Sequence, residues 1–293
     1  MPLIDASQIY QMTNVGDHID GTDVYQNNPN LLDNAYFVGG GSQLGDGVFP
    51  INQKGLTTYT TDGANIDRWK QYSATVTLAS DGVTVTPSAY SNNFLQLMNP
   101  AKWDALAGET VTLSIEVLAV TGTITVAGYN TGIGTITSTG IVAFTFTMPS
   151  GIADGNKFFG LAGQSGSSIK FGKWKLEIGT VSTLANDVPP NFAAEYEKCR
   201  YYLRYIPLTR YAIAIDGANA YMTMIGMPMA KVPTPSLITA GGVRDAGGQS
   251  TITSATVTGF ANKIATVQFA LSASRSYVVG YIYDTVLCLS AEL

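Results

Sequence analysis

The chain has 293 residues, of which 45% are hydrophobic and only 13% are charged, and its net charge is −5. It can bury a sizeable core and is long enough for two domains, but its charged fraction is about half that of a typical soluble globular protein. A negative net charge without clustered Lys and Arg argues against electrostatic binding of nucleic acid. The scarcity of charge predicts a neutral surface or one buried between subunits, so we expect an oligomer.

The sequence gives no indication of membrane insertion or export. No apolar run approaches the roughly 20 residues of a membrane helix. Residues 1–5 lack the basic and apolar regions of a signal peptide, so we expect the protein to be made in a cytoplasm. In such a reducing compartment Cys199 and Cys288 are expected as buried thiols, and a disulfide between them is the alternative.

Residues 1–29 form a polar segment rich in Asn, Asp and Gln. Such a segment buries too little apolar surface to order itself. We expect it to act as an attachment arm that docks on a neighbouring subunit or on another protein, and an arm packed locally on its own chain is the alternative.

Residues 30–188 carry the period-two alternation of β-strands. Residues 111–117 alternate apolar and polar side chains, and the alternation continues over residues 124–126 after a turn at Thr121-Gly122, which predicts a hairpin. A second hairpin is predicted over residues 75–86, where an Asp-Gly pair can adopt the positive φ angles of a tight turn.

A third alternating run covers residues 142–148 and ends at a proline. The strand over residues 169–178 changes parity halfway. A bulge near Gly172-Lys173 would correct the parity and place five apolar side chains on the core face. These five are Ile169, Phe171, Trp174, Leu176 and Ile178.

One convincing helical fragment follows Pro190, with Asn191 as its cap and a length of one to three turns. Its apolar face is formed by Phe192, Tyr196, Cys199 and Leu203. From about residue 195 onward the alternation of strands returns.

Within this second region, alternation over residues 211–215 stops at Asp216-Gly217 and resumes over residues 221–225. Further runs cover residues 264–269 and 277–283. The proline-containing stretch 227–235 predicts an edge strand or a loop, because Pro cannot donate to a sheet ladder. Short strands with Gly and Asn turns and almost no helix predict an all-β chain: an antiparallel sandwich, a short helical linker and a second compact β-domain.

Four blocks of sequence, in order, carry a resemblance to a known family. They are residues 30–37 (NLLDNAYF), residues 51–55 (INQKG) with 66–69 (IDRW), residues 171–179 (FGKWKLEIG), and residues 189–192 (PPNF) with 197–202 (EKCRYY). The combination resembles tail-fibre and tail-appendage proteins of bacteriophages and prophages. Arg200 stands where that family more often has Gln, and the resemblance covers roughly residues 30–205.

The resemblance implies a jelly-roll sandwich similar to carbohydrate-binding modules and a place in a virus particle. It implies three parts: an N-terminal virion-attachment arm (1–29), a jelly-roll β-sandwich (30–188) and a C-terminal β-domain entered by a short helix (189–293). The partners it implies are other virion proteins bound through the arm.

Catalytic chemistry is not indicated. Nucleophilic hydrolysis of the Ser/His/Asp or Cys/His type needs an imidazole base, and the only histidine is His18 in the polar segment. A glycosidase needs two carboxylates facing each other across a cleft. Glu195 and Glu197 would face different sides of a helix, and we expect both on the solvated surface.

Metal and phosphate sites are not indicated either. The acidic residues Asp17, Asp20 and Asp23 lack the spacing of a calcium loop. The glycine-rich run over residues 39–47 is neither preceded by a βαβ pattern nor followed by a helix start, so we interpret it as a flexible loop. We therefore expect no enzyme activity, no metal and no cofactor.

Aromatic side chains are the remaining candidates for recognition, because their rings stack on the apolar faces of sugars. Trp69 and Trp174 lie among core-like strand residues and are expected in the core, whereas Trp103 lies in a loop-like stretch and is expected to be exposed. The candidates for a glycan or subunit interface are Trp103, Tyr201, Tyr202, Tyr205, Tyr277, Tyr281 and Tyr283.

The sequence and the resemblance together predict a non-enzymatic phage virion protein, a tail fibre or receptor-binding adhesin that is a homotrimer and binds a host-surface glycan. The alternative is a purely structural appendage, such as a collar, baseplate or capsid-decorating protein, that binds other virion proteins.

Overall fold

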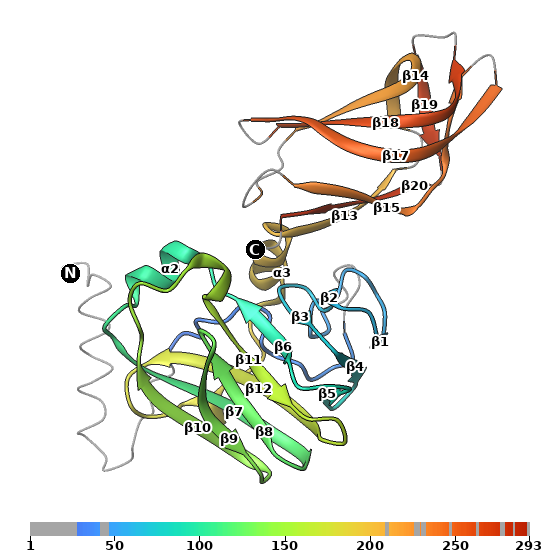
Figure 1. Ribbon diagram of the computed structural model, residues 1–293. Helices are drawn as coiled ribbons and strands as arrows, with labels where there is room; N and C mark the ends of the chain where they lie inside the picture. Colours follow the sequence, from blue (N-terminus) through green and yellow to red (C-terminus); the bar gives the residue numbers. More distant parts are fainter. Residues whose placement is uncertain are drawn as a thin grey trace, which may run out of the picture.

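The structure is a computed structural model, and it describes residues 28–41, 47–208, 211–225, 229, 233–245, 248–261, 264–275, 279–283 and 285–291. The described chain is built almost entirely of antiparallel strands, which confirms the predicted all-β class (Figure 1). None of its described helices is long and apolar enough to cross a membrane. The predicted attachment arm lies outside the described residues up to residue 27.

Two six-stranded sheets form the first part of the fold. The first sheet has the order β1 (Thr58–Tyr59), β4 (Ala74–Ala79), β5 (Gly82–Pro87), β12 (Ser168–Ile178), β7 (Thr110–Thr121) and β10 (Gly140–Thr147). The second has the order β2 (Gly63–Ala64), β3 (Lys70–Gln71), β6 (Asn92–Leu97), β11 (Phe158–Gly163), β8 (Ile124–Gly128) and β9 (Thr131–Ile136). Apart from the hairpins β4–β5 and β8–β9, the chain from β4 to β12 changes sheet at every connection, the connectivity expected of a jelly roll.

The hairpin predicted over residues 75–86 is confirmed, because β4 pairs with β5. The hairpin predicted over residues 111–126 is wrong: β7 and β8 belong to different sheets. Val117 and Ile124 on either side of the turn are both buried in the same core. Alternation identifies the core-facing side chains, but it does not reveal that the two strands contribute them from opposite sheets.

The predicted bulge in β12 is confirmed by register shifts on both sides of Phe171 in its pairing with β7. The bulge brings Ile169, Phe171, Trp174 and Leu176 onto the core face. Ile178 departs from the prediction, since its side chain is 49% exposed. It is the last residue of β12, and the chain turns away at Gly179 with φ of 110°.

The sandwich core is centred on aromatic rings, and the predicted burial of Trp69 and Trp174 is confirmed. Trp69 stacks on Phe94 with ring centroids 4.7 Å apart, and Trp174 meets Trp69 edge-on at 5.3 Å. Such pairs stabilise a core beyond their buried area by about 1 kcal/mol each.

Short helices close one end of the sandwich and lead out of it. They are α2 (Pro100–Ala105), the 3-10 turns η1 (Asp154–Asn156) and η2 (Leu184–Asn186), and α3 (Phe192–Arg200). The predicted helix is α3, and its predicted cap is confirmed because the Asn191 side chain accepts from the N–H of Ala194. The sequence reasoning missed α2, whose signals are Asn99 as cap and a proline in its first turn.

The C-terminal β-domain contains a closed barrel and a small sheet, and α3 lies between it and the sandwich (Figure 1). The barrel has the order β14 (Tyr211–Ile225), β18 (Ile264–Arg275), β17 (Gly248–Ala261), β16 (Gly242–Asp245) and β19 (Val279–Tyr283). The small sheet has the order β13 (Leu203–Leu208), β20 (Thr285–Ser290) and β15 (Thr234–Thr239). The predicted edge near the prolines is therefore β15, which pairs only with β20 in that sheet.

The break expected at Asp216-Gly217 is a bulge within one long strand. Before it β14 pairs with β19, and after it β14 pairs with β18. Gly217 has φ of 57°, a conformation that glycine adopts without strain. The bulge is thus the point at which β14 passes from one neighbour in the barrel to the other.

Candidate functional site

Residues 28–37 extend along the edge of β12 that β5 leaves free, since β5 pairs with β12 only as far as Phe171. Three backbone hydrogen bonds attach them: Leu31 N to Leu176 O (2.8 Å), Trp174 N to Ala35 O (2.9 Å) and Phe37 N to Gly172 O (2.8 Å). Two of the four sequence blocks, far apart in the chain, therefore lie side by side.

Asn34 is the centre of a buried hydrogen-bond network and is 1% exposed. Its side-chain nitrogen donates to the carbonyls of Ile51 and Asp67 (both 2.8 Å), and its Oδ1 accepts from the Ile51 N–H (2.8 Å). Its backbone carbonyl accepts from Trp69 Nε1 (2.9 Å), and its backbone N–H donates to the Glu195 carboxylate in α3. This one residue ties loops of the sandwich to the helix.

Gln53 extends the network to the C-terminal β-domain. Its backbone N–H and its side-chain nitrogen donate to the Asp67 carboxylate at 2.9 and 2.5 Å. The same side-chain nitrogen donates to the carbonyl of Leu203, the first residue of β13 (2.8 Å). The Tyr202 carbonyl accepts from the N–H of Ala291. The residue that follows β20 is therefore bound beside the start of β13.

Arg68 is a buried cation, 2% exposed, that binds three different groups. Its Nε lies 3.2 Å from the Asp33 carboxylate, and its terminal nitrogen donates to the Leu97 carbonyl (3.0 Å). Its guanidinium carbon is 3.5 Å from the centroid of the Tyr202 ring. A planar guanidinium can satisfy an ion pair and a ring face together, which an ammonium does less well. Its φ of 72° is unusual for a residue with a long side chain and is held by these contacts.

The outward-facing side chains of β12 hold the linker that follows it. Lys175 and Glu177 are almost fully buried. The Lys175 ammonium lies 2.5 Å from the Asp187 carboxylate, and Glu177 accepts from the backbone N–H and the hydroxyl of Thr183 at 2.8 and 2.6 Å. The strand is therefore buried on both faces, and residues 179–188 are fixed against it before α3 begins.

We call the buried set that links the sandwich, α3 and the start of the C-terminal domain the joint. Its members are Asn34, Gln53, Asp67, Arg68, Glu195 and Tyr202. All six lie within the sequence blocks of the resemblance or, for Glu195, between two segments of the last block. Three of the four blocks thus meet in space at one place, which short-range sequence patterns do not indicate.

An apolar cluster supports the joint. Phe49, Ile51 and Cys199 are buried, and Tyr36 and Phe192 pack against them. Phe49 contacts both Tyr36 and Phe192 edge-on, at 5.6 Å in each case. Cys199 is a free thiol, as predicted, and burial raises its pKa well above the ordinary value. Phe192, Tyr196 and Cys199 of the predicted apolar face of α3 therefore pack on the sandwich, whereas Leu203 was wrongly placed on that face, because α3 ends at Arg200 and Leu203 begins β13.

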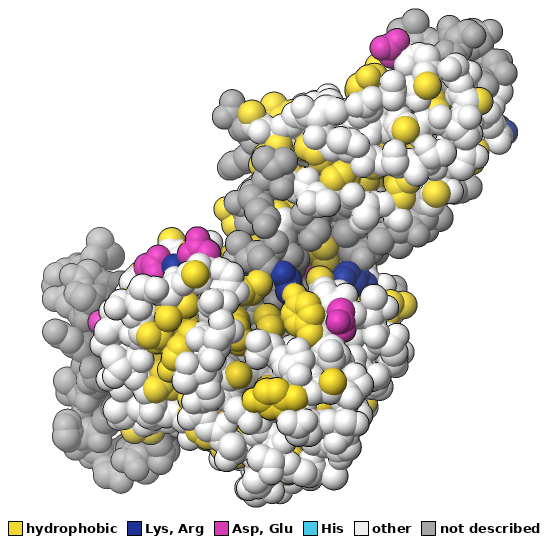
Figure 2. Space-filling view, viewed as in Figure 1, with side chains coloured by type: hydrophobic (Ala, Val, Ile, Leu, Met, Phe, Trp, Pro, Cys, Tyr) yellow, Lys and Arg dark blue, Asp and Glu magenta, His cyan; other side chains and the backbone are white. Residues whose placement is uncertain are grey.

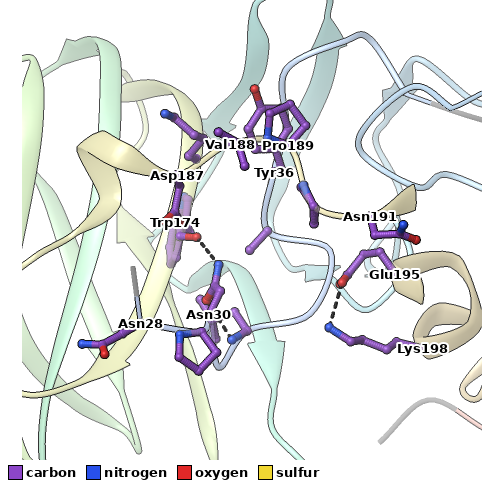
Figure 3. Close-up of a pocket in the computed structure, with 15 residues that line it drawn as sticks. Asn28, Asn30, Tyr36, Trp174, Asp187, Val188, Pro189, Asn191, Glu195 and Lys198 are labelled. Carbon is purple, nitrogen blue, oxygen red and sulfur yellow. Dashed lines mark hydrogen bonds and ion pairs between the residues drawn. The ribbon is translucent and has the colours of Figure 1, made fainter. Parts of the chain in front are cut away.

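A first cavity of about 390 Å³ lies between residues 28–36, β12 and α3 (Figure 3). Asn30 donates to the Trp174 carbonyl (2.7 Å) on one side of it. On the α3 side Glu195 and Lys198 form an ion pair of 2.8 Å. Its walls thus include residues of segment 28–36, Trp174 and the linker prolines, with Glu195 as the one joint residue in the lining.

A second cavity, of about 490 Å³, lies on the other side of residues 31–33, between α2 and α3. Its lining residues are Leu31, Asp33, Gln96, Met98, Asn99, Lys102, Ala194, Glu197, Lys198, Tyr201 and Tyr202. We call it the tyrosine cavity. Its volume is within the range of small-molecule binding sites. Figure 2 shows Lys and Arg side chains gathered where the sandwich meets the C-terminal domain.

Lys102 is the part-buried cation of the tyrosine cavity. Its ammonium donates to the Leu31 carbonyl (2.6 Å) and forms no ion pair with a carboxylate of the described chain. Burial lowers the pKa of Lys102, the Asp33 carboxylate opposes that change, and the cations Lys198 and Arg68 reinforce it.

The predicted aromatic candidates differ in burial and in their contacts. The prediction that Trp103 is exposed is wrong. Trp103 lies in α2, is 0% exposed, stacks on Phe159 and donates from Nε1 to the Pro149 carbonyl (3.1 Å). The unrecognised helix turns it inward. Tyr202 is buried under Arg68, and burial raises its pKa despite that cation.

Tyr201 is 40% exposed and meets the Tyr202 ring edge-on at 5.2 Å, so two candidates adjacent in sequence come together at the tyrosine cavity. Tyr283 is part-buried in the barrel, away from them. Tyr277 and the side chains of Tyr205 and Tyr281 lie outside the described part of the structure.

The two helical carboxylates differ from expectation. Glu195 was expected on the surface but is buried, because it accepts from Asn34 and pairs with Lys198. Glu197 is exposed, as expected, and pairs with Arg200 (2.6 Å). Within the described ranges no group of three or more His, Cys, Asp or Glu is positioned to hold a metal ion. His18 and the acidic residues 17–23 lie outside those ranges.

Sequence reasoning missed the roles of Lys102, Arg68 and Asn34. Arg68 and Asn34 lie in quoted blocks and carry positive φ angles, which single-sequence patterns do not predict. Comparison with protein-family models and with curated proteins gives no match for this chain.

Proposed function

We propose that this chain is a non-enzymatic virion protein of a phage or prophage, a tail fibre or receptor-binding adhesin in which the sandwich and the C-terminal domain are coupled through the joint. The observation that carries the proposal is that three of the four resemblance blocks meet at that joint, while the fourth, residues 171–179, pairs with residues 31–37 beside it. An appendage that reaches a cell surface has to keep its modules in register. The buried hydrogen bond from the Asn34 N–H to the Glu195 carboxylate and the contact of the Arg68 guanidinium with the Tyr202 ring do this, whereas a Gly/Ser linker does not.

The proposal includes a homotrimer and reversible binding of a host-surface glycan. Exposed apolar side chains on the sandwich, among them Leu118, Ile141 and Val181, support contacts between copies. Exposed Tyr201 beside a cavity supports contact with a sugar. A single copy should bind weakly and a particle with several copies far more tightly, because linked sites act together.

The second candidate is a purely structural appendage that binds other virion proteins through its arm. Burial of Trp103 and Tyr202 favours it, since both rings are engaged inside the protein.

The test incubates the full-length chain, and particles that carry it, with host cells and extracted surface polysaccharide. We expect reversible binding without release of reducing sugar, and light scattering at the mass of a trimer. Release of reducing sugar would contradict the non-enzymatic role. Complete failure of the particles to bind the cells they infect would favour the structural candidate, and a stable monomer at micromolar concentration would exclude the trimer.

A further inference from the structure

We infer, on the basis of the proposed adhesive function, that the tyrosine cavity binds a sugar bearing a carboxylate. In this arrangement the Lys102 ammonium pairs with the carboxylate, and the Tyr201 ring lies against the apolar face of the sugar ring.

The charges around the cavity carry the first part of the argument. Each acidic group there already has a cation: Asp33 with Arg68 at 3.2 Å, Glu195 with Lys198 at 2.8 Å and Glu197 with Arg200 at 2.6 Å. Lys102 has only the Leu31 carbonyl. The lining itself holds two acids, Asp33 and Glu197, and two cations, Lys102 and Lys198. Because both acids and Lys198 are already paired, Lys102 is the cation of this lining that has no carboxylate partner among the described residues.

The position of the Lys102 ammonium carries the second part. Lys102 projects from α2 into a part-buried site, where removal of water makes an unpaired ammonium unfavourable. Two further cations, Arg68 and Lys198, disfavour the ammonium more, while the carboxylates of Asp33 and Glu195 favour it. An anion entering the cavity would relieve both effects, whereas a neutral or cationic ligand would not.

The aromatic wall carries the third part and selects a sugar acid over a simple anion. Tyr201 is exposed, and its edge-on contact with buried Tyr202 restrains its ring. Tyr202 is itself held by Arg68, so the stacking surface is braced through the joint. A restrained exposed ring beside an unpaired cation suits a ligand with one apolar face and one carboxylate.

The experiment measures binding of three acidic probes, trigalacturonate, sialyllactose and a hyaluronan tetrasaccharide, by calorimetry on the full-length protein. The methyl esters of the same sugars are the neutral counterparts. We expect each bound acid to bind more tightly than its ester. Lys102→Met should weaken binding of the acid about tenfold and leave the ester unchanged, because a hydrogen bond to a charged group is lost. Lys102→Arg should retain most of the affinity.

Tyr201→Ala should weaken acid and ester alike, about fivefold, because the stacking surface is lost in both cases. Lys170→Met, a lysine that pairs with Asp81 on the sandwich away from this cavity, is the matched control and should change neither. Thermal unfolding of each variant establishes that it is folded.

Equal binding of acids and esters, or tight binding of the acids to Lys102→Met, would overturn the inference. So would absence of binding to all three acids. Cell adsorption separates these results from failure of the proposed function: particles carrying Lys102→Met that adsorb normally refute the sugar-acid site alone, whereas wild-type particles that do not adsorb refute adhesion itself.

Discussion

The joint and the C-terminal barrel differ in what fills their interiors. At the joint the buried groups are charged or amide side chains, such as Arg68, Asp67 and Asn34, and each has a specific partner. In the barrel, the buried side chains of the described strand residues are apolar except for the hydroxyl of Ser250. Apolar burial is non-directional, while a buried charge or amide requires a partner at a fixed distance and angle. The apolar side chains therefore stabilise the barrel, whereas the polar contacts of the joint fix the orientation of the sandwich, α3 and the start of the C-terminal domain.

The sandwich and the C-terminal domain also have separate apolar cores, and the second of these fills the barrel and its small sheet. We therefore expect two unfolding transitions, one for each region. Substitutions that act on only one transition sharpen the comparison, and substitutions that shift both would break it.

The largest effect is expected from Phe269→Ala in the barrel. Phe269 is fully buried in β18, between β14 and β17, so its truncation should lower the free energy of unfolding of the barrel by about 4 kcal/mol. Ile264→Ala in the same strand is the control, because that side chain is 39% exposed and should cost less than about 0.5 kcal/mol. Denaturant titration followed by circular dichroism measures both, and an equal shift of the sandwich transition would contradict separate cores.

Arg68→Ala should produce the next largest effect, on the sandwich transition. It removes a buried guanidinium and leaves Asp33 and the Leu97 carbonyl without it, at a cost of about 3 kcal/mol in unfolding free energy. Arg200→Ala is the matched control: its ion pair with Glu197 is exposed, and its loss should cost less than about 0.5 kcal/mol. Similar effects of the two variants in the same titration would mean that the joint is no more specific than a surface ion pair.

Apolar cores and polar contacts also differ in how far the sequence predicts them. Strands of the barrel and the sandwich follow from alternation, because buried and exposed side chains alternate along a strand. Alternation predicted the hairpin over residues 75–86 and the bulge near Gly172. It failed at Thr121-Gly122, because two strands facing one core look the same whether they pair or lie in opposite sheets.

The site was harder to predict because its residues act through contacts distant in the sequence. Asn34 meets Glu195, and Gln53 meets Leu203, across most of the chain. No local pattern marks such pairs. Trp103 was predicted to be exposed because a six-residue helix with a proline in its first turn looks like a loop. Tyr201 is exposed because it follows the last residue of α3, and its role in binding stays a prediction.

Asn191→Ala should have a smaller effect. The Asn191 side chain accepts from the N–H of Ala194 at 3.0 Å and caps α3, the helix that carries Glu195 into the joint. Loss of a helix cap costs about 1 kcal/mol. We expect the sandwich transition to move by that amount and the barrel transition to stay in place. Asn191→Asp keeps an acceptor at the cap and should restore stability, and a loss of equal size in both variants would contradict the capping role.

The smallest effect should appear in the reactivity of Cys199, which reports opening of the joint without global unfolding. The thiol is buried on the inner face of α3, and burial raises its pKa, so a thiolate should form only when the helix detaches. If detachment is a rapid equilibrium, alkylation by iodoacetamide should follow its population, and the loss of about 1 kcal/mol in Asn191→Ala should raise the rate about fivefold. Peptide mass spectrometry separates Cys199 from Cys288, and Phe269→Ala should leave the Cys199 rate unchanged because it acts on the other core. A rapid wild-type reaction at Cys199, or acceleration by Phe269→Ala as large as that by Asn191→Ala, would mean that the joint opens together with the barrel.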